Sequence, residues 1–439
     1  MNQPFAAYRG QAIRVERFNA QVSALAEALP DCRYIVNFCE DRYRFCAAFA
    51  ASLASSRITL LPPDRSPRNL RRIDEQYPGA LYLTDDISRQ PEGRDCFHVD
   101  LDALNLLGFR APASVPAERT ALIAFTSGST GEPQAHEKTW GSLCESARLI
   151  DSALGFTQGK SMVATVPPQH MYGLELSVLL PLRHGAVLDA GKPFFPRDIA
   201  EALSLAPEPR ILVTTPIHLR ALLRDGIELP RLDSIVSATA PLARSLAADC
   251  ENRFGAPLVE IYGCTEAGSI ASRRSVESDE WTLFENIRLV EDGAAHRVEA
   301  PHLRTPATLN DIIETLDARR FRLRGRAADL VNIAGKRNSI GALNRVLAEI
   351  EGVVDGTFFL PEEDGGGIPR LLAFAVAPTL SAEAILAHLR EQLDPAFVPR
   401  TVYLLDALPR AETGKLPRML LEEILRRRSA SARATGVGN

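Results

Sequence analysis

Short hydrophobic, β-branched runs recur along the first 265 residues, and stretches with helical spacing of apolar positions separate most of them. The hydrophobic runs begin near Tyr34, Ile58, Ala121, Ser161, Ala186, Ile211, Ser234 and Leu258. The helical stretches between them include residues 43–55, 141–154, 216–224 and 241–254. Strand alternating with helix is typical of an α/β fold with a largely parallel sheet. Ligands bind such sheets at the carboxyl ends of the strands, so the loops that follow the strands are the places to look for function.

The pattern changes near residue 327. A glycine-rich turn is predicted at residues 333–335 and a helix at 341–351. Two strands within 358–378, a second helix at 382–393 and a further strand at 401–405 follow. This order predicts a small α+β domain behind a large domain with parallel-rich sheets and helices. The predicted limits are 1–326 for the large domain, 327–425 for the small domain, and 426–439 for a disordered, Arg- and Ser-rich tail.

Composition narrows the classes of partner. The chain has 439 residues, 46% hydrophobic and 24% charged, with a net charge of -5. That balance argues against nucleic acid or an anionic membrane as a partner, because both favour a basic face. The seven cysteines form no CxxC pair, so their spacing offers no zinc or dithiol motif. The N-terminus lacks a signal-peptide core, and no apolar run reaches the ~18 residues of a membrane span. We therefore expect a soluble, cytoplasmic protein without stable membrane insertion.

The strongest chemical signal is the segment Thr126-Ser127-Gly128-Ser129-Thr130-Gly131-Glu132-Pro133, which directly follows a predicted strand. Its glycines allow a turn with exposed N–H groups, and its hydroxyls can donate to phosphate oxygens. It does not match the GxxxxGK[ST] loop of P-loop nucleotidases. The segment predicts a polyphosphate cradle, and the alternative is a plain turn between a strand and a helix.

Two further segments add chemistry. Tyr262-Gly263-Cys264-Thr265-Glu266 follows another predicted strand and offers an aromatic face, a hydroxyl and a carboxylate that could hold Mg²⁺. The alternative is a loop with a surface glutamate. Near the C-terminus, Thr413-Gly414 makes a turn that presents Lys415, a point charge suited to a developing oxyanion. Alone, that turn is also typical of an exposed basic loop.

Together these segments resemble the acyl-adenylate-forming superfamily, which includes acyl-CoA synthetases, peptide-synthetase adenylation domains and luciferases. That family carries a TSGSTGxPK loop, a YGxTE element and a late PRTxxGK loop in the same order. Its TGD and GRxDD elements correspond here to Leu309-Asn310-Asp311 and Gly325-Arg326-Ala327-Ala328-Asp329. The resemblance extends from about Ala121 to Arg418.

The resemblance implies ATP and Mg²⁺ as cofactors and assigns a role to each motif. The β- and γ-phosphates would be bound by the loop Thr126, Ser127, Gly128, Ser129, Thr130 and Gly131. Tyr262 and Gly263 would lie beside the adenine, and Glu266, next to Thr265, would hold Mg²⁺. Asp311 and Arg326 would contact the ribose, and Lys415 would bridge the carboxylate and the α-phosphate. The small domain would then rotate and present a thiol-facing surface formed by Gly335, Lys336 and Arg337.

Several positions depart from the family pattern. Gln134 stands where the family usually has lysine, and Ala328 replaces the usual hinge aspartate. His136 and Lys138 could partly replace the missing cation, but we expect both on a helix that follows the loop, facing solvent. The stretch from Glu266 to Asp311 is also shorter than usual.

The resemblance also points to the acid. His170, Met171, Tyr172 and Gly173 follow a predicted strand and would line the acid pocket, with His170 beside the carboxylate. Thr239, Ala240 and Pro241 would form a second wall whose small residues leave room for a flat ring or an acyl chain. No aspartate stands where amino-acid-activating relatives pair the ammonium group, which disfavours an amino acid.

The arrangement is most similar to stand-alone AMP-ligases of aryl polyene and xanthomonadin-type pathways. This implies a hydroxybenzoate-like acid that is transferred to a thiol in trans, either CoA or an acyl carrier protein. A ligase for fatty or β-hydroxy acids remains an alternative, and so does a non-catalytic nucleotide-binding relative, which Gln134 favours. The missing GK[ST] argues against a kinase or P-loop nucleotidase.

Overall fold

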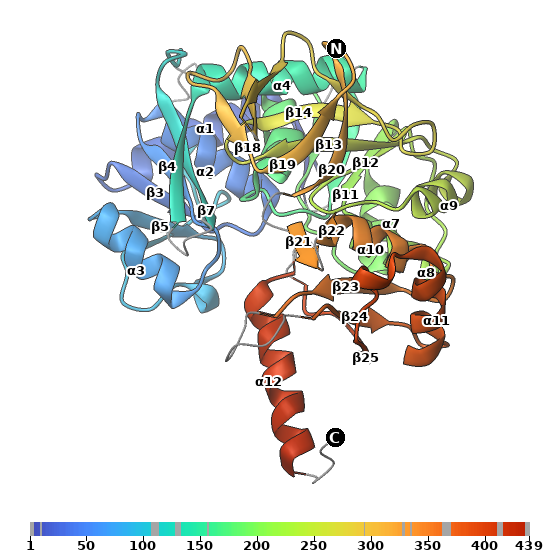
Figure 1. Ribbon diagram of the computed structural model, residues 1–439. Helices are drawn as coiled ribbons and strands as arrows, with labels where there is room; N and C mark the ends of the chain where they lie inside the picture. The colour runs from blue at the N-terminus through green and yellow to red at the C-terminus, as the bar shows by residue number, and fades with distance from the viewer. Residues whose placement is uncertain are drawn as a thin grey trace.

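A computed structural model describes residues 4–8, 11–106, 114–127, 133–155, 158–293, 295–326, 330–333, 336–361, 370–410 and 416–434. Two large sheets with helices packed around them form most of the molecule, and the C-terminal elements gather at one side of these sheets (Figure 1). This mixed α/β arrangement confirms the predicted fold class.

The first sheet has the strand order β6-β5-β3-β4-β7-β8. Its strands are parallel apart from the antiparallel pair β7 and β8. The strands span Tyr34–Asn37 (β3), Ile58–Leu61 (β4), Leu81–Thr84 (β5), Cys96–His98 (β6), Thr120–Ser127 (β7) and Pro133–Thr139 (β8). The helices of this region are α1 (Val15–Ala28), α2 (Arg42–Ala54), α3 (Pro67–Gln76) and the 3₁₀ turn η1 (Ile87–Arg89).

The second sheet has the order β19-β20-β15-β14-β13-β12-β11-β9-β10-β1-β2. Strands β1, β10, β9, β11, β12 and β13 pair in parallel, and the remaining pairs are antiparallel. Its first strands in chain order span Ala6–Tyr8 (β1), Gln11–Ile13 (β2), Ser161–Ala164 (β9), Val187–Asp189 (β10), Arg210–Thr214 (β11) and Ser234–Ser237 (β12). The others span Leu258–Cys264 (β13), Gly268–Arg273 (β14), Trp281–Leu283 (β15), Asp311–Thr315 (β19) and Arg320–Arg326 (β20). A separate small sheet contains β16 (Arg288–Asp292), β17 (Ala295–Glu299) and β18 (Ala307–Leu309).

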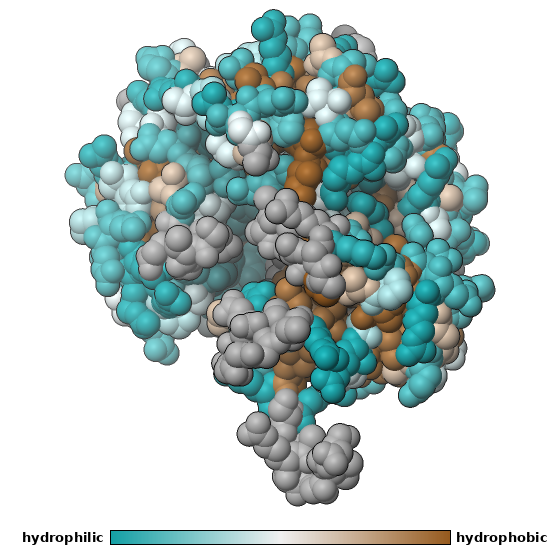
Figure 2. All heavy atoms as spheres, viewed as in Figure 1, coloured by the Kyte–Doolittle hydropathy of each residue, from teal (hydrophilic) through white to brown (hydrophobic). Residues whose placement is uncertain are grey.

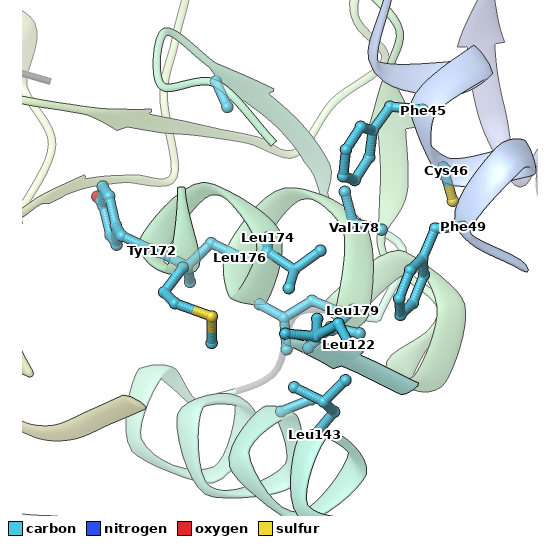
Figure 3. Packing of buried hydrophobic residues seen from close by; sticks show 14 of the residues in the cluster. Phe45, Cys46, Phe49, Leu122, Leu143, Tyr172, Leu174, Leu176, Val178 and Leu179 are labelled. Atoms are coloured by element: carbon cyan, nitrogen blue, oxygen red, sulfur yellow. The ribbon is translucent and has the colours of Figure 1, made fainter. Parts of the chain in front are cut away.

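The helices that accompany the second sheet include one continuous helical run through the hydrophobic core. It consists of α5 (Met171–Leu174), a π-helical turn η2 (Glu175–Leu179) and α6 (Leu180–His184). Figure 3 shows this run between Phe45 and Phe49 of α2 on one side and Leu143 of α4 on another, and all of these side chains are buried. The remaining helices are α4 (Trp140–Leu154), α7 (Pro196–Leu205), α8 (Pro216–Asp225) and α9 (Arg244–Phe254).

The C-terminal elements have a hydrophobic core of their own, which includes Leu343, Phe358 and Ile385. The strands are β21 (Leu330–Ile333), β22 (Lys336–Ser339), β23 (Asp355–Phe359), β24 (Leu372–Val376) and β25 (Thr401–Leu404). The helices are α10 (Ile340–Ala348), α11 (Ala382–Gln392), the 3₁₀ turn η4 (Pro395–Phe397) and α12 (Arg418–Ala434). A separate core cluster is consistent with a small domain, whose predicted limits stay a prediction.

The end of the chain differs from the sequence-based expectation. Residues 426–434, predicted to be disordered, belong to α12, which extends away from the small sheet (Figure 1). Leu421 of this helix is buried against the C-terminal elements, and ion pairs such as Arg418–Glu422 and Arg427–Glu423 join successive turns. Pairs at this spacing support a helix that composition alone does not predict. In the part of the chain that is described, no helix is long and apolar enough to cross a membrane.

Candidate active site

Two paired antiparallel strands flank the predicted phosphate loop in the chain. Strand β7 ends at Ser127 and β8 begins at Pro133, and the two strands pair from Ser127↔Pro133 to Thr120↔Thr139. Residues 128–132 lie outside the described residues, so Gly128, Ser129, Thr130 and Gly131 stay predictions. Figure 2 shows a hollow with hydrophilic residues beside it, between the part that contains α3 and the C-terminal part.

The segment after the loop corrects the sequence-based expectation. His136 and Lys138, expected on a solvent-facing helix, lie in strand β8. The helix begins only at Trp140, because the Thr139 hydroxyl accepts a hydrogen bond from the Ser142 N–H and caps it. Alternation along the strand gives His136 and Lys138 the same face. The His136 side chain is 19% exposed, and Lys138 is 7% exposed.

The second motif spans the end of β13, where its first three residues lie, and the turn to β14, which carries Thr265 and Glu266 directly beside this hairpin. The Lys138 Nζ donates a hydrogen bond to the Glu266 carbonyl oxygen at 2.6 Å. The His136 Nε2 lies 3.7 Å from Glu266 Oε1 and 3.0 Å from Thr126 Oγ1. Burial lowers the pKa of His136, while the Glu266 carboxylate opposes this shift. A hydroxyl of the first motif and the carboxylate of the second therefore border the same small space.

A close backbone approach shapes the same turn. Strand β13 is irregular between Tyr262 and Gly263, where the register with β14 shifts. A Cβ on Gly263 would lie 2.2 Å from the Gly268 carbonyl oxygen, and Gly268 has a φ of +72°. Both positions require glycine for these reasons. Thr265 lies in the turn itself, between the two glycines.

Tyr262 and Asp311 are joined across the second sheet. The Tyr262 hydroxyl donates to Asp311 Oδ2 at 2.7 Å. The Tyr262 ring packs near Trp281 and Phe321, with centroid distances of 5.6 and 5.7 Å. Asp311 lies opposite Arg326 in the β19–β20 ladder, although the Arg326 side chain is outside the described residues. This arrangement places the residues predicted to bind adenine and ribose next to one another.

The first predicted wall of the acid pocket is tightly built into the fold. His170 precedes α5 and is half-buried, whereas Met171 and Tyr172 are buried. The Tyr172 hydroxyl bonds to the carbonyl oxygens of Val236 at 2.8 Å and Thr214 at 3.3 Å, at the ends of β12 and β11. Burial raises the pKa of Tyr172 well above its usual value. Tyr172 therefore fixes this segment against the strand ends.

Gly173 completes that segment. A Cβ there would lie 2.1 Å from the Pro167 carbonyl oxygen, so no larger residue fits without backbone movement. The predicted second wall follows β12, where Thr239 has a φ of +78°. A β-branched residue in the left-handed region is strained, and such strain is concentrated at functional sites. Ala240 is half-buried and Pro241 is exposed.

The third motif is described only in part. Lys415 and Gly335 lie outside the described residues, and so does the side chain of Arg337. Lys336 forms an ion pair with Asp394 at 2.5 Å. Arg410 binds both carboxylate oxygens of Asp355, at 2.7 and 2.8 Å. The roles predicted for the catalytic lysine and the thiol face therefore stay predictions.

Two residues near the Glu266 turn were not predicted. Glu175 is 1% exposed and accepts hydrogen bonds from Ser146 Oγ and Ser269 Oγ, both at 2.6 Å. His302 is 7% exposed, and its Nε2 donates to the Ala267 carbonyl oxygen at 2.6 Å. A carboxylate inside the apolar run MYGLELSVLL could have pointed to Glu175. No comparable sequence signal marks His302.

The residues around Glu266 fit a Mg²⁺ that is bound together with nucleotide phosphates better than a metal bound by protein side chains alone. Among the described residues, no three His, Cys, Asp or Glu side chains cluster as a metal site. Mg²⁺ with nucleotides commonly takes one or two carboxylates together with substrate phosphates and water. The single carboxylate of Glu266, 28% exposed beside Thr126 and His136, matches that requirement.

Several known proteins are similar to this chain in sequence or in fold. Residues 22–293 match the family described as AMP-binding enzyme. The 4-coumarate–CoA ligase of Halorhodospira halophila is 29% identical over 323 residues, covering 68% of this chain and 76% of that protein. The 3-hydroxybenzoate–CoA ligase of Aromatoleum sp. (strain CIB) is 25% identical over 361 residues, covering 72% and 68%. The fold is similar to that of Bacillus subtilis O-succinylbenzoate coenzyme A synthetase in complex with ATP and magnesium ion, with a TM-score of 0.78, 18% identity, and 96% and 97% coverage.

Proposed function

The chain belongs to the AMP-binding enzyme family, and from this premise we propose that it activates a hydroxybenzoate-like aryl acid with ATP and transfers the acyl group to a thiol. As an acyl-adenylate-forming enzyme, it is an AMP-forming acid–thiol ligase. The proposal concerns the acid, the acceptor thiol and the residues that carry the reaction.

The reaction has two steps. A carboxylate oxygen attacks the α-phosphorus of ATP, so that acyl-AMP forms as the bond to pyrophosphate breaks. A thiol sulfur then attacks the acyl carbon, the thiol loses its proton, and AMP leaves as the thioester forms. The first step brings two anions together, so a cation at the reacting oxygens can accelerate it by roughly 10²–10³.

The observation that carries the proposal is the contact between the two ATP motifs. His136 links the two motifs, because its Nε2 lies 3.0 Å from Thr126 Oγ1 and 3.7 Å from Glu266 Oε1 beside the β7–β8 hairpin. In the proposed mechanism this hairpin would bind the polyphosphate, and Glu266 would hold a Mg²⁺, which would supply positive charge beside the phosphates. Tyr262 would lie against the adenine, and Asp311 would accept a hydrogen bond from the ribose. Lys415 would approach the reacting carboxylate from the small domain.

The proposed acid follows from the two pocket walls and from the relatives. His170 precedes α5 at the rim of the second sheet, and Thr239 and Ala240 supply a small-residue wall after β12. A flat aryl ring suits such a slot. Two relatives of this chain are a 4-coumarate–CoA ligase and a 3-hydroxybenzoate–CoA ligase. CoA is accordingly one acceptor to test, and a separate acyl carrier protein is the other.

The test is release of AMP and pyrophosphate from ATP across a panel of aryl, fatty and β-hydroxy acids, with CoA or a carrier protein. We expect turnover with hydroxybenzoates. Lys415→Ala should abolish acid-dependent exchange of pyrophosphate into ATP, whereas Lys160→Ala, which removes a surface pair with Asp233, should not. Turnover only with fatty or β-hydroxy acids would overturn the aryl assignment. Binding of ATP without AMP formation for any acid would favour a non-catalytic relative, for which Gln134 is the best sequence support.

A further inference from the structure

The turn that carries Thr265 and Glu266 is held by three buried polar side chains from separate parts of the chain. Lys138 of β8 donates to the Glu266 carbonyl oxygen, and His302, which precedes β18, donates to the Ala267 carbonyl oxygen, both at 2.6 Å. Glu175 of η2 accepts hydrogen bonds from Ser269, at 2.6 Å from Oγ and 3.3 Å from the backbone N–H. These bonds hold residues 266, 267 and 269, at the turn and the start of β14.

Burying the charged side chains of Lys138 and Glu175 costs free energy. Lys138 is 7% exposed and Glu175 is 1% exposed. An isolated buried charge costs several kcal/mol unless another charge and hydrogen bonds compensate it. Burial lowers the pKa of Lys138, and the negative charge of Glu175 is the leading influence that opposes this shift. Both side chains are buried against the same turn, Lys138 at residue 266 and Glu175 at residue 269, so their opposite charges lie in one low-dielectric region.

The Lys138 ammonium is directed at the protein backbone. Its Nζ lies at hydrogen-bonding distance from the Glu266 carbonyl oxygen. The Glu266 side chain extends toward His136, which in turn contacts Thr126. The lysine thus contacts the main chain of the residue whose carboxylate borders the phosphate loop. Loss of the Lys138 ammonium would release the carbonyl and leave the buried Glu175 carboxylate with hydrogen bonds from Ser146 and Ser269 but without that positive charge.

We propose that Lys138 is a positioning residue that fixes the Thr265–Glu266 turn for Mg²⁺-nucleotide binding, with Glu175 as its charge partner across the turn. This inference rests on the proposed function, because Glu266 matters here as the Mg²⁺-binding carboxylate. Residues that orient a metal ligand without touching the metal commonly change metal affinity or activity by about 10–100-fold when they are replaced.

The test compares Lys138→Met, Lys138→Arg and Glu175→Gln with the wild-type chain. Pyrophosphate exchange is measured at varied Mg²⁺ and varied acid, and thermal unfolding is measured in parallel. We expect Lys138→Met to lower kcat by roughly 10–100-fold and to raise the Mg²⁺ concentration needed for half-maximal rate, with KM for the acid little changed. Lys138→Arg should restore much of the loss. Lys160→Met, which removes the Lys160–Asp233 pair at the amino-terminal ends of the strands, should leave both parameters unchanged.

A double variant separates positioning from folding. If the two charges compensate each other, the loss of stability in Lys138→Met/Glu175→Gln should be smaller than the sum of the losses in the two single variants. The double variant should still need more Mg²⁺ than the wild-type chain for half-maximal rate. A wild-type Mg²⁺ requirement in a folded Lys138→Met or double variant would overturn the proposal. Additive effects of the two changes on stability would overturn the role of Glu175. A wild-type chain without acid-dependent exchange would refute the proposed function instead, so the two failures are distinguishable.

Discussion

The Tyr262 hydroxyl donates a hydrogen bond to Asp311 Oδ2 at 2.7 Å, joining β13 to β19 across the antiparallel part of the second sheet. The bond links two motifs that lie 49 residues apart in the chain. It orients a carboxylate that we propose to bind ribose, through a side chain whose ring is supported by Trp281 and Phe321.

Tyr262→Phe should therefore weaken nucleotide binding with little loss of stability. The ring keeps its aromatic neighbours, but the Asp311 carboxylate loses the Tyr262 hydroxyl as a donor. Hydrogen bonds to charged groups contribute about 1.5–3 kcal/mol, so KM for ATP should rise by roughly 10–100-fold. Steady-state kinetics at saturating acid measure this change. Tyr172→Phe is the contrasting variant, because it removes a buried bond to Val236 and should lower the unfolding temperature. An unchanged KM for ATP in Tyr262→Phe would exclude a role for the pair in ribose binding.

A second prediction concerns strain at Thr239, whose φ is +78°. Strained backbone of this kind costs on the order of 1–3 kcal/mol, and glycine removes it at an entropic cost of roughly 0.5–1 kcal/mol. Thr239→Gly should thus raise the free energy of unfolding by about 1 kcal/mol. If Thr239 also shapes the acid pocket, the variant should lose discrimination among aryl acids in kcat/KM.

Ser56 offers a matched control for this prediction. It is exposed, has a φ of +64°, and lies in the loop after α2. Ser56→Gly should relieve comparable strain without any change in acid selectivity. Equal selectivity of Thr239→Gly and the wild-type chain would remove Thr239 from the pocket wall.

The sequence predicted much of the architecture because periodicity and motif order are local properties. The helices α8 and α10 begin within one residue of their predicted positions. The YGCTE segment was predicted to follow a strand, but its first three residues belong to β13 itself, and only Thr265 and Glu266 lie in the turn. Sequence reasoning failed at His136 and Lys138, where a hairpin places a strand before the helix. A local sequence pattern could not reveal this strand, because it forms by pairing with β7.

Contacts between distant residues were also beyond prediction. Glu175 and Ser269 are 94 positions apart, and Lys138 and Glu266 are 128 positions apart. Their hydrogen bonds depend on how the two sheets are packed around the helical run of α5, η2 and α6, which no single segment encodes. The proposed site is therefore predictable as a set of motifs, while the polar residues that support it become apparent only in three dimensions.

A third prediction follows from Asp189 at the end of β10. Burial raises its pKa to about 6, although the fully buried Arg42 opposes the shift. Because the unfolded chain has a pKa near 3.9, the folded state binds the proton more tightly. The stability gained from this tighter proton binding is fully present below about pH 4, and it is lost as the pH rises through about 6. The free energy of unfolding should then fall between pH 5 and pH 7.

Comparison with Asp189→Asn isolates this effect, since the amide oxygen can still accept the Gly191 N–H bond that Asp189 accepts at 3.1 Å. Denaturant unfolding at pH 5, 6 and 7 should show a smaller loss of stability in the variant than in the wild-type chain. The same pH dependence in both proteins would mean that Asp189 titrates normally in the folded state.

The last prediction concerns the rim of the phosphate hairpin. Gln134 is exposed and shares its face of β8 with His136 and Lys138, so Gln134→Lys would add a cation beside the phosphate loop. Exposed charge pairs contribute about 0.2–1 kcal/mol and are weakened by salt. KM for ATP should fall by roughly 1.5–5-fold at low ionic strength, with a smaller effect at high salt. Glu137→Gln changes the net charge by the same amount on the opposite face of the strand and is the matched control. An equal fall in KM for both variants would assign the effect to net charge, and no fall for Gln134→Lys would mean that residue 134 does not face the nucleotide.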